Sequence, residues 1–221
     1  MKNFGRRRTR RYTAYRSLMT DGMLLYCVII LLCMALIWAA NLLLLSPLAA
    51  GGAFSVLWAV TGSTLAVIAL DGLLAFLIRR LPAQWFRSGK RLFLASRREC
   101  RLYVRLGIRR WKNKIPELGV FTGFHKNKVR HPEDNAYIAR FILECNYGTV
   151  IHLAGALLGF LIVFLCPLAY APWVGIPVAV VNFVLNLLPT FVLRYNVPKL
   201  EALYALNARK AQAPLQAKIP G

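Results

Sequence analysis

The sequence predicts an all-α membrane protein with four transmembrane helices in two hairpins, and a basic cytoplasmic interfacial helical segment between the hairpins. The 221 residues are 58% hydrophobic with a mean hydropathy of +0.51, which is too apolar for an ordinary soluble domain. The formal net charge is nevertheless +21. Four apolar runs approach the roughly 20 residues that cross a bilayer: 23–48, 53–78, 149–170 and 173–193.

Short connections containing Pro and Gly join the first run to the second and the third run to the fourth. They are too short for anything but antiparallel neighbours, which predicts the two hairpins. The helix of the fourth run is expected to end near Arg194. The resulting regions are a basic arm, a first hairpin, an interfacial segment, a second hairpin and a C-terminal tail: 1–22, 23–78, 79–148, 149–193 and 194–221.

The basic residues predict the orientation of the chain. Of the 29 Lys and Arg, seven precede the first run, 17 lie between the second and third runs, five follow the fourth run, and neither short connection holds one. The positive-inside rule therefore places both termini and the middle segment in the cytoplasm. The arm at 1–16 is expected to orient the protein and attract anionic membrane lipids, and not to be a cleaved signal. No nucleic-acid motif accompanies the charge, so nucleic acid is not expected as a partner.

The middle segment predicts an amphipathic helix lying in the membrane interface. Apolar residues recur there at roughly helical spacing between dense Arg and Lys: Phe93, Cys100, Val104, Ile108 and Trp111. Pro116 and Gly119 are expected to end this helix. Residues 132–134 then open a new helix, which runs into the third apolar run.

The cysteines predict no metal site and no cofactor. They form no CxxC motif and no Cys/His cluster, and two of them fall on the reducing side. All five are interpreted as unpaired packing residues: Cys27, Cys33, Cys100, Cys145 and Cys166.

Four polar side chains lie in or beside the apolar runs, all in the cytoplasmic halves: Asp71, Glu144, His152 and Asn186. A charge inside a span costs about 2.5–3.5 kcal/mol on insertion scales. Scattered structural polar residues would not be expected to share one leaflet, so they indicate a site. Structural explanations stay open. Asn182 and Asn186 can bond across helices, which is the favoured explanation for Asn182, the GxxxG of 155–159 packs helices closely, and Pro189 kinks a helix.

Glu144 and His152 are eight residues apart, so they share a broad helix face. A histidine with a nearby carboxylate is the minimal general-base arrangement. Other classes compete with an enzyme. A non-catalytic membrane scaffold or accessory subunit explains the basic face but not the one-leaflet clustering. A transporter would need polar residues in both leaflets or inverted repeats, and the sequence shows neither. No nucleotide-binding glycine motif supports a membrane methyltransferase.

Several short motifs occur in a fixed order along the second half of the chain. RWKNKIP begins at Arg110, Glu144 and His152 follow, then come Asn186 and Pro189, and RYNVPKL begins at Arg194. This order, over about residues 100–203, resembles the glycosyl-4,4'-diaponeurosporenoate acyltransferase family of bacterial membrane proteins. The resemblance implies a multi-pass protein of the bacterial cytoplasmic membrane that transfers an acyl group to a hydroxyl of a sugar or glycolipid.

The chain departs from the pattern of that family at several positions. Around the RYN motif, Leu193 stands where the family usually has Gln, and Val197 and Lys199 stand where it usually has Arg. Near His152, Thr149 replaces the usual Glu and Leu153 replaces the usual Trp. The scaffold therefore matches better than the acceptor chemistry, and the carotenoid acceptor is not carried over.

The resemblance and the charge map together suggest acyl-CoA as the donor, because a basic rim above a polar intramembrane site suits a polyanion with an apolar tail. His152 is expected to take the proton of the acceptor hydroxyl, Glu144 to orient its imidazole, and Asn186 to donate to the oxyanion. Seven further residues are predicted to bind substrate. Lys112, Lys114 and Arg194 are expected to hold phosphate, Trp111 and Tyr195 to lie at the interface, and Asp71 and Asn196 to complete the set.

Overall fold

The computed structural model describes residues 2–44, 52–112, 115 and 129–216, with side chains described outside 2–22 and 213–216. Those ranges contain helices and turns and no strand. Four helical stretches are long and apolar enough to cross a membrane: Met23–Leu44, Gly52–Arg79, Asn135–Leu165 and Ala171–Gln212. The predicted all-α membrane protein with four transmembrane helices is confirmed.

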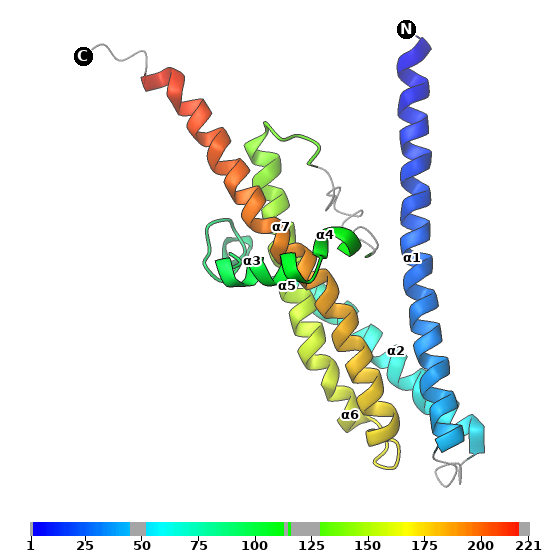
Figure 1. Ribbon diagram of the computed structural model, residues 1–221. Helices are drawn as coiled ribbons and strands as arrows, with labels where there is room; N and C mark the ends of the chain where they lie inside the picture. The colour runs from blue at the N-terminus through cyan, green and yellow to red at the C-terminus, as the bar shows by residue number, and fades with distance from the viewer. Residues whose placement is uncertain (1, 45–51, 113–114, 116–128, 217–221) are drawn as a thin grey trace.

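The long helices are α1 (Lys2–Leu44), α2 (Gly52–Arg79), α5 (Asn135–Leu158) and α7 (Ile176–Gln216). The short elements are η2 (Ala83–Trp85), α3 (Arg97–Arg105), α4 (Ile108–Trp111), η5 (Gly159–Leu161), α6 (Ile162–Leu165) and the π-helical turn η6 (Ala171–Gly175). In Figure 1, α5 and α7 lie side by side at the centre, while α1 approaches the others at its lower end and diverges above. Valines of α2 pack with α6, η6 and the start of α7 in a buried cluster at this lower end.

Helix α5 begins where the sequence predicts. Asp134 is its N-cap, and its side chain accepts hydrogen bonds from the backbone N–H groups of Ala136 and Tyr137. A carboxylate there satisfies donors that the first turn leaves unpaired. The helix then continues unbroken to Leu158 and carries Glu144 and His152 with it.

Helix α7 does not end near Arg194, so that prediction is wrong. It continues through Pro198 to Gln216. Val197 and Leu200 are buried against Ile138 and Ile142 of α5. This packing supports the helix beyond the apolar run, and a proline removes only one hydrogen bond of the ladder.

The segment between α2 and α5 is not one amphipathic helix, which corrects the prediction. Its described residues form turns, η2, α3 and α4, and Gly89 and Gly107 adopt positive φ values of 79° and 63°. Such backbone interrupts a helix and favours glycine. A capping box of Ser96 and Glu99 starts α3. The predicted end at Pro116 and Gly119 lies outside the described residues.

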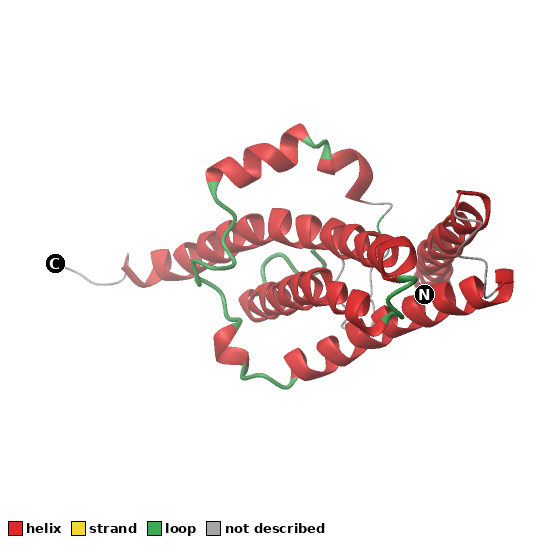
Figure 2. Cartoon of the chain, turned by 90° about the horizontal axis from the view of Figure 1, so that it is seen from below, coloured by secondary structure: helices red, strands yellow, loops and turns green. Residues whose placement is uncertain are grey.

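We call residues 80–112 the collar, because they pass around the α5–α7 pair (Figure 2). On α5, the side chains of Asn146 and Tyr147 donate to the carbonyls of Phe86 and Leu81. Collar aromatic residues also pack there, with the Phe86 ring stacked on Tyr147 at a centroid distance of 4.1 Å. The collar thereby holds α3 and α4 across α7. The apolar residues predicted for one face are divided, since Phe93 and Ile108 are buried in different clusters and Val104 is exposed.

Candidate active site

Three of the predicted polar residues form a continuous hydrogen-bonded chain across three helices. The His152 Nδ1 atom of α5 lies 2.9 Å from Asn186 Oδ1 of α7. The Asn186 Nδ2 atom lies 2.8 Å from Asp71 Oδ2 of α2. We call these three residues the His152 chain. The sequence predicted that all three lie in the cytoplasmic halves of their helices, and the structure joins them by hydrogen bonds.

The hydrogen bonds of the His152 chain run in one direction, and this direction fixes the tautomer of the neutral imidazole. Asn186 Nδ2 donates to Asp71, because a carboxylate oxygen accepts. The Asn186 Oδ1 atom therefore faces His152 and accepts from an Nδ1–H. In the neutral ring the proton is then on Nδ1, and Nε2 keeps its lone pair. A neutral imidazole in this tautomer can accept a proton at Nε2.

Asn182 completes the surroundings of the amide. Its Nδ2 donates to the Gly155 carbonyl across the helix interface at 3.1 Å, so its predicted cross-helix bonding is confirmed. Its backbone and side-chain oxygens lie 3.2 and 3.1 Å from Asn186 Nδ2. Both hydrogens of the Asn186 amide are therefore directed at Asp71 and Asn182. This corrects the expectation that Asn186 donates to an oxyanion, because its amide holds its neighbours in place.

The GxxxG of α5 makes room for these side chains. A Cβ atom at Gly155 would lie 2.4 Å from Asp71 Oδ1 and 3.2 Å from Asn186 Oδ1, and a Cβ atom at Gly159 would lie 2.3 Å from Asn182 Nδ2. The close packing expected of this motif is thus an approach of polar side chains to bare backbone. Asp71 Oδ1 is buried there without a hydrogen-bond partner among the described residues, and buried unpaired polar atoms are rare.

Glu144 is not the carboxylate partner of His152. Its Oε2 lies 2.9 Å from Arg79 Nη1, and Arg79 also lies 6.0 Å from the ring centroid of Tyr147. Two helical turns separate Glu144 from His152 along the axis, about 12 Å at 1.5 Å per residue. The carboxylate joined to His152, through Asn186, is that of Asp71.

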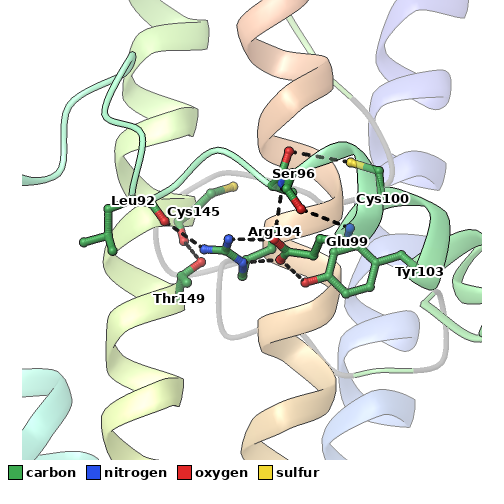
Figure 3. Close-up of polar contacts among 9 residues, drawn as sticks. Leu92, Ser96, Glu99, Cys100, Tyr103, Cys145, Thr149 and Arg194 are labelled. Carbon is green, nitrogen blue, oxygen red and sulfur yellow. Dashed lines mark hydrogen bonds and ion pairs between the residues drawn. The ribbon is translucent and has the colours of Figure 1, made fainter.

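Arg194 lies in a second polar cluster, where α3 crosses α7 (Figure 3). Its Nε and Nη2 atoms donate to the two carboxylate oxygens of Glu99, the latter at 2.9 Å, and its Nη1 donates to the Leu92 carbonyl at 3.0 Å. The Tyr103 hydroxyl donates to the same carboxylate. We call Arg194, Glu99 and Tyr103 the Arg194 clamp. Since Arg194 is bound to α3, it is directed away from the predicted phosphate contact.

The contacts within the Arg194 clamp shift the pKa values of Glu99 and Tyr103. Hydrogen bonds from Arg194 lower the pKa of the Glu99 carboxyl, and partial burial opposes them. Burial raises the pKa of the Tyr103 hydroxyl, and the neighbouring Glu99 raises it further. Glu99 is therefore ionised at neutral pH and Tyr103 is a neutral donor.

The other predicted rim residues lie beside the clamp. The Tyr195 hydroxyl accepts from Arg109 Nε at 2.9 Å, and the Lys199 Nζ atom lies 3.3 Å from the centroid of the Tyr195 ring. Trp111 donates to the Leu106 carbonyl and packs on the buried residues of this cluster. Asn196 is buried and Lys112 is half-buried, whereas Lys114 lies outside the described residues.

Sequence reasoning missed Glu99 and the spatial role of Gly155 and Gly159. The S-x-x-E capping box at Ser96 was a signal for Glu99, although it reports the helix start and not the bond to Arg194. Within the described ranges, no three His, Cys, Asp or Glu side chains come together as metal ligands.

The comparisons with known proteins give one family. The family model for glycosyl-4,4'-diaponeurosporenoate acyltransferase matches residues 82–206 of the sequence. The matched range includes His152, Asn186 and Arg194, and it begins after Asp71. Searches of curated proteins and of solved structures found no match to the chain.

Proposed function

The chain belongs to the glycosyl-4,4'-diaponeurosporenoate acyltransferase family, and on this premise we propose that it moves a fatty acyl group from cytoplasmic acyl-CoA to a hydroxyl of a sugar or glycolipid. As a member it is an acyltransferase of the membrane. The observation that supports the proposed site is the His152 chain, which leaves the imidazole with an acceptor nitrogen between membrane helices.

His152 acts as the general base in the proposed reaction. Its Nε2 takes the proton of the acceptor hydroxyl while the hydroxyl oxygen bonds to the carbonyl carbon of the acyl thioester. The tetrahedral intermediate collapses with loss of the C–S bond, and the coenzyme A thiolate leaves with the proton from the imidazolium. The Asn186 oxygen holds Nδ1–H throughout, and the Asp71 carboxylate offsets the positive charge that develops on the ring.

Asn186 is therefore a positioning residue in this mechanism, and Glu144 lies outside it. Glu144 neutralises Arg79 at the cytoplasmic end of α2 and so supports the packing of α2 on α5. This is the main change from the expectation based on sequence order, which assigned the acidic role to Glu144.

The donor approaches from the cytoplasmic side in this proposal. The collar and the C-terminal part of α7 supply the cations, with Lys112 and Lys114 as candidate phosphate ligands. The same basic residues attract anionic lipid headgroups. Both termini are cytoplasmic in the proposed topology, as the charge distribution indicates. The acceptor is a membrane lipid bearing a sugar hydroxyl.

Lipid mass spectrometry tests the proposal. Membranes from native-host cells that express the wild type, His152→Ala or His131→Ala are compared at equal protein abundance. His131 is exposed on the approach to α5 and contacts Tyr137, so it is a matched control. A lipid heavier by one acyl group is expected in the wild type and His131→Ala only. Equal amounts of that lipid with His152→Ala would refute the role of His152, and its absence from all three would favour a non-catalytic scaffold.

A further inference from the structure

A proline within α7 leaves one backbone carbonyl without its helical donor. Proline has no N–H, so the carbonyl four residues earlier loses its partner in the helix ladder. Pro189 affects the Leu185 carbonyl in this way. An unpaired carbonyl in an apolar surrounding is costly, and another donor must replace the missing one.

Side chains of α1 donate to this carbonyl and to one carbonyl of η6. The Tyr26 hydroxyl donates to the Leu185 carbonyl at 2.7 Å, and the Asn41 Nδ2 atom donates to the Trp173 carbonyl at 3.0 Å. Asn41 also donates to the Ile37 carbonyl within α1. Among the α1 side chains that the structure describes, Asn41 alone is buried and Tyr26 is half-buried. Polar contacts to backbone carbonyls of α7 and η6 thus anchor a helix that otherwise packs loosely.

The two anchors differ in their distance from the candidate active site. Leu185 immediately precedes Asn186, whose amide joins His152 to Asp71. Trp173 lies more than three helical turns before Asn186, in η6, which precedes α7. The Tyr26 bond therefore acts on the turn that carries the site amide, and the Asn41 bond does not.

We infer that Tyr26 is a positioning residue of the acyltransferase, because it supplies to Leu185 the hydrogen bond that Pro189 withholds and so holds Asn186 against His152. This inference rests on the proposed function of the His152 chain. Tyr26 comes from a part of the chain that precedes the family match at 82–206. The first hairpin accordingly completes the site through Tyr26 as well as through Asp71.

The test is a set of four variants, in which a second substitution is expected to rescue the first. Tyr26→Phe removes one hydroxyl group and is expected to lower kcat about three- to tenfold, the usual range for one hydrogen bond, with little change in the KM for acyl-CoA. Pro189→Ala restores the backbone N–H, so it is expected to keep kcat near that of the wild type. The double variant Tyr26→Phe/Pro189→Ala is expected to regain most of the loss. Asn41→Leu removes the distant anchor and is expected to leave kcat unchanged.

Hydrogen exchange in nanodiscs provides a readout that does not depend on activity. Tyr26→Phe is expected to speed amide exchange across 182–190, the double variant to reverse this change, and Asn41→Leu to affect 171–178 instead. Wild-type kcat in Tyr26→Phe, an inactive Pro189→Ala, or a double variant without rescue would each overturn the inference. If His152→Ala retains activity, the proposed function fails separately, and the exchange data still decide whether Tyr26 holds this turn.

Discussion

Helix α7 carries two polar clusters eight residues apart, and they differ in what they leave unbound. In the His152 chain, hydrogen bonds fix one side of the imidazole and leave Nε2 with a lone pair. In the Arg194 clamp, every guanidinium nitrogen has a partner, as Figure 3 shows. In the proposed mechanism the first arrangement holds a reactive atom in place, whereas the second joins two helices. Polarity at the membrane boundary is therefore not by itself evidence of chemistry.

The largest effect that would sharpen this comparison is expected from Asp71→Asn. The new amide can still accept from Asn186 Nδ2, but it carries no charge to offset an imidazolium on His152. We expect kcat to fall about tenfold to a hundredfold, as for the loss of a charge-assisted hydrogen bond, with an unchanged Tm. Steady-state kinetics in nanodiscs measures the loss.

Glu144→Gln is the matched control for Asp71→Asn, because it removes one carboxylate charge next to Arg79. It is expected to keep kcat within about twofold, as is usual for partly exposed ion pairs. A larger loss in Glu144→Gln than in Asp71→Asn would restore Glu144 as the acidic partner of His152.

A smaller effect is expected from adding one methyl group beside the His152 chain. A Cβ atom in Gly155→Ala would lie 2.4 Å from Asp71 Oδ1, so the carboxylate must shift and drag Asn186 with it. We expect kcat to fall about tenfold, in line with the cost of overpacking.

Gly148→Ala is the control on the same helix. There the new methyl group would lie 2.8 Å from Leu193 Cδ1, the far end of a flexible side chain that can move away. Its kcat is expected to stay within about twofold of the wild type, because such rearrangements are inexpensive. Equal losses in the two glycine variants would show that helix spacing, and not the position of Asp71, sets the rate.

The sequence identified the members of the His152 chain because charged and amide groups are conspicuous in apolar runs. It assigned the acidic partner incorrectly, since spacing along one helix reports a shared face and not the neighbours that other helices supply. Asp71 reaches His152 through Asn186, a contact between three helices that no single run encodes. Tyr26 gave no signal, because an aromatic residue in an apolar helix is ordinary until its bond to the Leu185 carbonyl is seen.

The collar was mispredicted for a different reason. Apolar residues recur there at helical spacing, but Gly89 and Gly107 adopt positive φ values that are incompatible with a continuous helix. Periodicity is evidence for a helix only over an unbroken stretch. Conversely, α7 was predicted to end near Arg194. It continues to Gln216, because packing of Val197 and Leu200 on α5 outweighs the proline at 198.

The smallest expected effect separates the Arg194 clamp from the site by its pH dependence. The folded state lowers the pKa of Glu99 through its bonds to Arg194. The stability that this ionised carboxylate contributes is therefore fully present above its unfolded pKa, about 4.3. It is lost as the pH falls through the lower folded value. Glu99→Gln should lower the stability at pH 7 by about 1 kcal/mol, since the pair is partly exposed, with little change in kcat.

Tm measured in nanodiscs between about pH 3 and 8 checks this prediction. The gap in Tm between the wild type and Glu99→Gln should be constant at neutral pH and close on the acid side. Glu201→Gln is the control, because Glu201 accepts one neutral N–H from Gly89 of the collar and should give a smaller gap. If Glu99→Gln instead abolishes turnover while Tm stays unchanged, the clamp takes part in the reaction, and the division between a structural and a reactive cluster on α7 is wrong.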